Sequence, residues 1–177
     1  MEAPDEELML AYGRGDAGAF ETLYKRHRGA LYRFVLRSIK HRSSAEDLFQ
    51  EAWIRVIDSR SRYTAQARFT TWLYTIAHNL VVDHWRRKGL SLVQLEQEPG
   101  LAAADNPARQ AEAREALARL VHAIEALPAA QREAFLLHEE AGLTVAEIAA
   151  VTGAGEEAAK SRLRYAMAKL KAAVDDD

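Results

Sequence analysis

The chain has 177 residues, enough for one ordinary domain or two small ones. Apolar residues make up 49% of it, so a folded core is expected. It contains no cysteine, which excludes disulfides, thiolate nucleophiles and cysteine-based metal sites. Apolar runs such as Ala134–Leu137 are far shorter than the ~20 residues that span a bilayer, and the acidic first residues do not resemble a signal peptide. We therefore expect a soluble, cytoplasmic protein that makes no contact with a membrane.

The net charge of −2 conceals an uneven distribution along the chain. Residues 1–88 carry 15 basic and 11 acidic side chains, a net of +4, whereas residues 112–177 carry 8 and 12, a net of −4. Between positions 60 and 88, six Arg and Lys residues face a single acid, Asp83. A local basic segment in an otherwise acidic chain indicates contact with a polyanion. The alternative is an ordinary solvated helix face.

The first half of the chain is predicted to be helical, because its apolar residues recur every three or four positions. Asp16 is a suitable N-cap, and Ser43–Glu46 has the pattern of a capping box. The expected helices are a short one that ends at Gly15, then 17–37, 43–58 and 69–87.

Residues 89–106 are predicted to form a linker, since they contain Gly89, Pro99 and Gly100 and show no sustained period. Asn106 and Pro107 are typical of a helix start. The expected helices beyond it are 107–126, 128–138, one that runs from the capping box Thr144–Glu147 to Thr152, and 156–174. The prediction is an all-α fold with two small helical domains, 1–88 and 107–177, joined by a flexible linker.

Residues 144–171 have the pattern of a helix-turn-helix: a short capped helix, a break at Gly153 and a longer helix. Ala149 would allow the two helices to approach closely, and Gly153 would take the positive φ of the turn. A recognition helix contacts bases and phosphates through polar and basic side chains on its outward face. The candidates here are Lys160, Ser161, Arg162, Arg164 and Tyr165. An ordinary helical hairpin is the alternative.

Residues 59–88 alternate aromatic and basic side chains, a combination that suits single-stranded or opened nucleic acid. The aromatic residues include Tyr63, Phe69 and Trp72. Tyr63 is a candidate nucleic-acid contact, whereas Trp72 is expected to lie in the core. The polar and basic candidates are Arg62, Gln66, Arg68, Asn79, Arg86, Arg87 and Lys88.

These segments together resemble a known family. Asp47–Glu51, Phe69–Asn79 and Asp83–Arg87 are similar to conserved region 2 of the bacterial sigma-70 family, and Thr144–Ala149 with Lys160–Arg164 is similar to its region 4.2. Because only these two regions and a short linker are present, the chain resembles the extracytoplasmic-function (ECF) group of alternative sigma factors. The resemblance covers essentially the whole chain, in the expected order.

The resemblance implies a partner for each segment. The helix with Glu46, Asp47, Gln50 and Glu51 would bind the β′ clamp helices of bacterial core RNA polymerase, and region 4 would contact the β flap. The loop from Ser61 to Ala67 would hold a base flipped out of the −10 element. Asn79 and the cluster Arg86, Arg87 and Lys88 would hold the −10 strands, whereas Lys160, Ser161 and Arg164 would contact the −35 element.

The chain departs from the family pattern at two places. Glu157-Ala158-Ala159 replaces a more common Gly-Thr-Val, which removes a hydroxyl that could bind phosphate. Ser44 stands where an acid is common on the polymerase-binding surface. One subgroup is controlled by a Ser/Thr kinase that phosphorylates a threonine on this polymerase-binding surface, and others by an anti-sigma protein. Glu51 therefore has two interpretations: a constitutively competent surface, or a mimic of a phosphorylated threonine.

Two other classes of function fit the sequence less well. An enzyme is not expected: His138-Glu139-Glu140 has Gly142 where a second zinc-binding His would stand, no glycine-rich phosphate loop is present, and neither a metal nor a cofactor is predicted. An autonomous dimeric helix-turn-helix regulator would bind a palindrome unaided. It would leave the basic and aromatic segment 59–88 without a role, so it ranks second.

Overall fold

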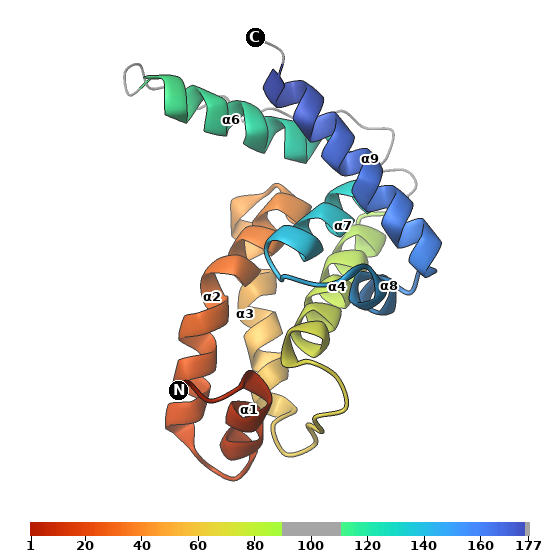
Figure 1. The fold of residues 1–177 in the computed structure, drawn as a ribbon. Coiled ribbons are helices and arrows are strands. Elements are labelled where there is room, and N and C mark those ends of the chain that lie inside the picture. Colours follow the sequence, from red (N-terminus) through yellow and green to blue (C-terminus); the bar gives the residue numbers. More distant parts are fainter. Residues whose placement is uncertain (90–110, 176–177) are drawn as a thin grey trace.

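The computed structural model describes residues 1–89 and 111–175, and these two parts contain eight helices and no strand (Figure 1). The predicted all-α fold is thereby confirmed. The linker beyond Gly89 and the helix start at Asn106-Pro107 lie outside the described residues.

The first unit consists of α1 (Asp5–Gly13), α2 (Ala17–Ile39), α3 (Arg42–Asp58) and α4 (Phe69–Arg87). Its core contains fully buried side chains from all four helices, among them Met9, Leu23, Phe34, Val56 and Leu73. This core forms because the apolar residues of each helix recur every three or four positions, so they share one face, and that face packs against the other helices.

The sequence predicts two N-caps in this unit, one at Asp16 and one at Ser43. Asp16 caps α2 as expected, its carboxylate accepting a hydrogen bond from the Ala19 amide at 3.2 Å. The predicted capping box at Ser43–Glu46 is wrong. Helix α3 begins one residue earlier, at Arg42, because the His41 ring serves as the N-cap and accepts from the Ser44 amide.

The second unit consists of α6 (Ala111–Ala126), α7 (Ala129–Glu139), α8 (Val145–Thr152) and α9 (Glu156–Asp175). The predicted capping box of α8 is confirmed: the Thr144 hydroxyl accepts from the Glu147 amide, and the Glu147 carboxylate accepts from the Thr144 amide. Gly153 ends α8 with φ of 72°, the left-handed conformation that lets α9 turn away.

The two units lie against one another (Figure 1). Helix α8 packs on α4, and α7 packs on α2, while α6 and α9 cross at the far end of the second unit. One continuous set of buried apolar residues runs through both units. The arrangement brings the helix-turn-helix directly beside the helix that carries much of the basic segment.

Candidate functional site

One face of α3 carries the residues that the sequence predicted to bind polymerase. Glu46, Asp47 and Gln50 are exposed and Glu51 is half-exposed. Glu46 and Glu51 each form an ion pair within the helix, with Arg42 and Arg55 respectively, at 3.4 Å. Such exposed pairs are weak, so the carboxylates are available to a partner.

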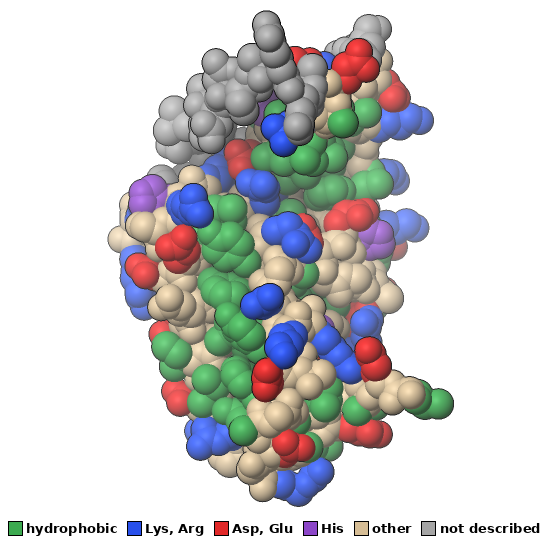
Figure 2. All heavy atoms as spheres, turned by 90° about the vertical axis from the view of Figure 1, so that its left-hand side faces the viewer, with side chains coloured by type: hydrophobic (Ala, Val, Ile, Leu, Met, Phe, Trp, Pro, Cys, Tyr) green, Lys and Arg blue, Asp and Glu red, His purple; other side chains and the backbone are tan. Residues whose placement is uncertain are grey.

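Sequence reasoning missed an apolar member of this face. Ile54 lies one turn beyond Gln50 and is 48% exposed, so α3 presents an aliphatic side chain among its polar and acidic ones. Figure 2, which views the molecule from the side of α2, shows hydrophobic side chains running as a stripe between charged ones. Half-buried aromatic residues of α2 and α3, such as Tyr32 against Phe49, belong to this unit's surface. A surface that combines apolar area with flanking charge suits a protein partner.

The loop between α3 and α4 exposes Arg62 and Gln66 but not Tyr63. The Tyr63 ring is only 7% exposed and packs edge-on against Trp72, with 5.0 Å between ring centres. Burial raises the pKa of Tyr63 to about 12, and the charges of Glu6 and Asp5 act in the same direction. In this conformation Tyr63 is a core residue, and its predicted DNA contact requires the loop to rearrange.

The remaining candidates of the basic segment are distributed along α4. Arg68 lies at its start, Asn79 is exposed near its middle, and Arg86, Arg87 and Lys88 are exposed at its end. The helix is ~28 Å long, so the candidates line an extended surface instead of meeting at one point. This geometry suits an extended single strand of nucleic acid, whose successive phosphates would lie along the helix.

The basic end of α4 is consistent with a polyanion surface. Within residues 1–89 and 111–175, Arg86, Arg87 and Lys88 form one ion pair, a loose one between Arg86 and Asp83 at 3.7 Å. Burial lowers the pKa of His84, and the charges of Lys88, Arg87 and His41 lower it further. The local field is therefore positive, as expected for a phosphate contact.

Helices α8 and α9 form the predicted helix-turn-helix. Ala149 is buried between them, and Ala159, Ala166 and Leu170 form the buried stripe of α9. On the outward side Lys160 and Arg164 are exposed, while Ser161 and Arg162 are half-buried. The Arg164 guanidinium lies 5.3 Å from the centre of the Tyr165 ring, which is 52% exposed. The arrangement allows two basic side chains one turn apart to enter a DNA groove.

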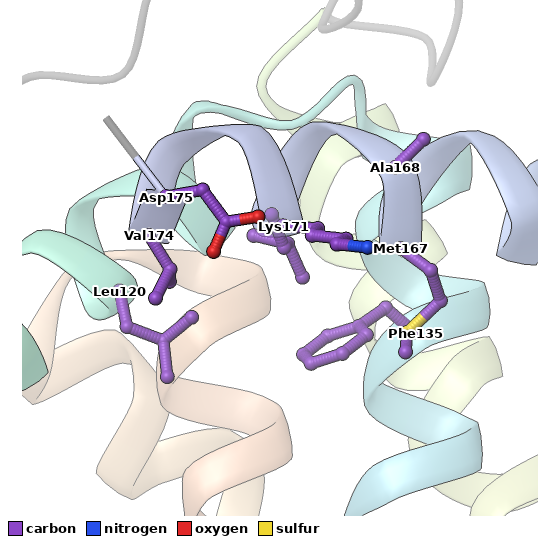
Figure 3. A pocket seen from close by; sticks show the side chains of 8 residues that line it. Leu120, Phe135, Met167, Ala168, Lys171, Val174 and Asp175 are labelled. Carbon is purple, nitrogen blue, oxygen red and sulfur yellow. The ribbon is translucent and has the colours of Figure 1, made fainter. Parts of the chain in front are cut away.

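An apolar groove that sequence reasoning missed lies between α6, α7 and α9 (Figure 3). Its volume is about 510 Å³, and Met167 and Val174 remain about half exposed in it. It is lined by Leu120, Phe135, Met167, Ala168, Leu170, Lys171, Val174 and Asp175. The signal was a pair of apolar residues beside the buried stripe of α9, Met167 and Val174, which lie seven positions apart and therefore on one face of the helix. Such a groove fits the apolar side of a partner helix.

Among residues 1–89 and 111–175, no group of three or more His, Asp or Glu side chains is arranged to hold a metal ion. Within the same ranges no helix is both long and apolar enough to cross a membrane.

Comparison with known proteins identifies both units. Residues 23–90 match the family model for sigma-70 region 2, and residues 117–170 match the model for sigma-70 region 4. The first match ends at the basic end of α4, and the second covers α8 and α9 up to residue 170.

Relatives match over nearly the full chain. The chain is 33% identical to the RNA polymerase sigma factor CarQ of Myxococcus xanthus, over 92% of this chain and 93% of CarQ. It is also 33% identical to the ECF sigma factor BldN of Streptomyces coelicolor, over 97% of this chain, although it spans only 66% of the length of BldN.

Among solved structures, CnrH in complex with the cytosolic domain of CnrY has a TM-score of 0.69 and 26% identity, with 98% of each chain covered. Sigma factors bind core RNA polymerase and promoter DNA and are transcription initiation factors. The alternative of an autonomous dimeric regulator is not supported, since the relatives BldN, CarQ and SigM, which match across both units, are sigma factors. The chain belongs to the sigma-70 family of RNA polymerase sigma factors, in its extracytoplasmic-function group.

Proposed function

We propose that α3 binds the β′ clamp helices of core RNA polymerase through Glu46, Asp47, Gln50 and Glu51, with Ile54 as an apolar anchor. Exposed carboxylates on one helix face favour a basic partner surface and speed its encounter. The groove between α6, α7 and α9 is the proposed site for a helix of the β flap, because its open, apolar lining fits an amphipathic helix.

The −10 element is proposed to lie along α4. Asn79 and the cluster Arg86, Arg87 and Lys88 would hold the strands, with Arg62, Gln66 and Arg68 at the other end of the helix. Tyr63 would contact a flipped base once the loop has opened, exchanging its packing against Trp72 for a base.

The −35 element is proposed to receive α9 in its major groove. Lys160 and Arg164 are the exposed candidates for base or phosphate contacts, and Ser161 and Arg162 lie beside them. Glu156 and Glu157 occupy the first turn of the helix, where they stabilise the helix N-terminus and reject misplaced phosphates.

Control by an anti-sigma protein is proposed over control by phosphorylation. The sigma factor RpoE of Bartonella quintana, which shares this fold with a TM-score of 0.71, was solved with the anti-sigma factor NepR. CnrH, which this chain matches over 98% of its length, was likewise solved with a second protein, the cytosolic domain of CnrY. Glu51 already supplies a carboxylate on the exposed face of α3, so no kinase is needed to create one. Exchange of Glu51 for Thr, with and without a Ser/Thr kinase, tests the remaining interpretation.

The observation that carries the proposal is the distribution of charge over three helices of one chain: α3 has an exposed acidic face, α4 is basic, and α9 has an exposed basic face. Its test is capture of bacterial core RNA polymerase by the tagged full chain. We expect retention of polymerase, loss of retention in Asp47→Arg, and full retention in Lys160→Ala. Failure of the unaltered chain to retain polymerase would contradict the proposal.

A further inference from the structure

The acidic first turn of α1 connects this helix to two others. Asp5, Glu6 and Glu7 follow one another there, and such carboxylates commonly stabilise the start of their own helix. In the structure Asp5 contacts α2, and Glu6 contacts the start of α4. Helix α1 also lies beside the loop that joins α3 to α4 (residues 59–68, the α3–α4 loop), at the lower end of the first unit in Figure 1. This loop is the one proposed to hold a flipped base.

Glu6 caps α4 from another helix. Its Oε1 accepts a hydrogen bond from the Phe69 amide at 2.8 Å. Arg68, the N-cap residue of α4, makes no capping hydrogen bond with its own side chain. The first amides of a helix have no partner within that helix, and a carboxylate placed there also meets the positive end of the helix dipole. Glu6 therefore replaces a local cap and fixes the point where the α3–α4 loop ends.

The other end of α1 fixes the start of the same loop. A Cβ at Gly13 would lie 2.5 Å from the carbonyl oxygen of Arg60, so the two backbones are in direct contact. The Arg60 guanidinium lies 5.8 Å from the centre of the Tyr12 ring, within the range of a cation–π interaction. Glu6 and Gly13 are seven positions apart and share one face of α1, with the fully buried Met9 between them.

Helix α1 is held in place by α2. Oδ2 of Asp5 lies 2.8 Å from Nε2 of His27, and Oδ1 accepts from Nη1 of Arg26 at 3.0 Å. The same Nη1 donates to the carbonyl oxygen of Ala3 at 2.7 Å. The His27 ring also packs against Phe69, with 5.3 Å between ring centres. Because these contacts give α1 a defined position, both ends of the α3–α4 loop are attached to one rigid element.

The middle of the loop is free to change between these two attachments. Residues 60–62 and 64–68 are exposed, and Tyr63 is buried between them. Within residues 1–89 and 111–175 the buried Tyr63 hydroxyl has no hydrogen-bond partner. Tyr63 therefore gives up packing against Trp72, but no hydrogen bond from its hydroxyl to these residues, when its ring leaves the core.

We propose that α1 positions the α3–α4 loop for recognition of the −10 element, with Glu6 as the positioning residue at one end of the loop and Tyr12 at the other. Both residues act through the loop and do not touch the DNA. The inference rests on the proposed contact between Tyr63 and a flipped base. A loop whose ends are already fixed loses less conformational freedom when it binds, so more of the contact energy appears as affinity for the correct base.

The test compares Glu6→Ala with Glu6→Gln and Glu7→Ala in holoenzyme assembled from the full chain and core RNA polymerase. Gln keeps an oxygen that can accept from the Phe69 amide, whereas Ala does not. Glu7 is the matched control: it lies in the same helical turn, it is exposed, and its side chain forms no hydrogen bond or ion pair within the two described ranges. The probe is fork DNA with a duplex −35 segment and a randomised single-stranded −10 segment. Sequencing of the bound molecules gives the base preference at each position.

A second pair of variants tests the other end of the loop. Tyr12→Leu removes the ring that faces the Arg60 guanidinium, whereas Tyr12→Phe keeps it. We expect Tyr12→Leu to lower the base preference by about threefold, since an exposed cation–π contact is weak, and to do so at the same position as Glu6→Ala. If Glu6→Ala does not fold, as judged by circular dichroism, this pair decides the question.

We expect Glu6→Ala to lower the base preference about tenfold at one position, that of the flipped base, because a hydrogen bond to a charged group is lost. Preferences at the other positions and affinity for the −35 duplex should stay unchanged, and Glu6→Gln and Glu7→Ala should match the unaltered chain. A merely structural role would instead lower binding equally at all positions.

Three results would overturn the inference: an unchanged preference in Glu6→Ala, an equal loss at every position, or equal preferences in Tyr12→Leu and Tyr12→Phe. Failure of the proposed function gives a different result. Absence of any base preference in the unaltered chain refutes the proposed −10 recognition itself, whereas a preference that survives Glu6→Ala refutes only the positioning role of α1.

Discussion

Glu147 closes the capping box of α8 and, with the same carboxylate, binds Arg68 at the start of α4, 3.0 Å away. One side chain therefore both starts the first helix of the helix-turn-helix and positions that helix against region 2. Exchange of Glu147 for Ala removes both functions, whereas exchange for Gln keeps the cap.

We expect Glu147→Ala to lower the free energy of unfolding by about 1 kcal/mol relative to Glu147→Gln, the usual contribution of a cap. Urea denaturation followed by circular dichroism measures this difference. Equal stability of the two variants would show that the capping hydrogen bond to Thr144 contributes nothing.

Lys160→Ala and Arg164→Ala should each weaken binding of the polymerase holoenzyme to promoter DNA by ~1–3 kcal/mol if these side chains contact bases. Fluorescence anisotropy with labelled promoter duplex measures the loss. Lys169→Ala is the matched control, because Lys169 lies on the same helix but donates to Gln131 of α7 at 3.0 Å. A similar loss in the control would indicate a general charge effect and not a specific contact.

Asp47→Arg should weaken the affinity for core polymerase without changing the preferred promoter sequence, since it reverses charge on the exposed face of α3 only. Asp58→Arg, at the other end of the same helix, is the control and should bind normally. Affinity is measured by titration of labelled chain with polymerase. Unchanged affinity in Asp47→Arg would remove this face from the polymerase contact.

Gly13 is required by a close backbone approach. A Cβ at this position would lie 2.5 Å from the carbonyl oxygen of Arg60, at the start of the loop that leads to α4. Gly13→Ala should therefore destabilise the protein by ~1–3 kcal/mol, the range for overpacking. Gly155→Ala meets open space and should have little effect. Thermal denaturation compares the two, and an unchanged melting temperature in Gly13→Ala would contradict the assigned contact.

Asp5 gives a pH dependence with a defined sign. Burial would raise its carboxyl pKa, but the hydrogen bonds and charges of His27 at 2.8 Å and Arg26 at 3.0 Å lower it below 3.8. The unfolded chain then binds more protons than the folded one just below pH 3.8, so the stabilisation by Asp5 is complete above that pH and is lost below it. Asp5→Asn should destabilise the protein at pH 7 and matter less at about pH 3, as urea unfolding at each pH will show.

Much of the fold could be predicted from the sequence because helix periodicity and caps are local. Asp16 and the Thr144–Glu147 box predicted two helix starts correctly, and Gly153 predicted the turn. The start of α3 was missed, because a histidine ring performed the role that the pattern gave to a serine.

The side-chain contacts that join the two regions could not be predicted, since the pairing of distant residues depends on tertiary placement. Glu147 was read only as a cap, Glu133 was not singled out, and Tyr63 was predicted at the surface although its ring is buried against Trp72. Nothing in the local sequence states which distant cation a glutamate meets. The groove at Phe135 and Met167 was missed for the same reason.

The central claim is that this sigma factor directs polymerase to promoters with two unlike elements. It is tested most directly by run-off transcription with core RNA polymerase on a promoter library, followed by sequencing of the transcripts. The account predicts initiation at promoters that share one −35 and one −10 motif, with the −35 preference altered in Arg164→Ala. Tight binding of the chain alone to a palindrome, with no polymerase-dependent initiation, would contradict it.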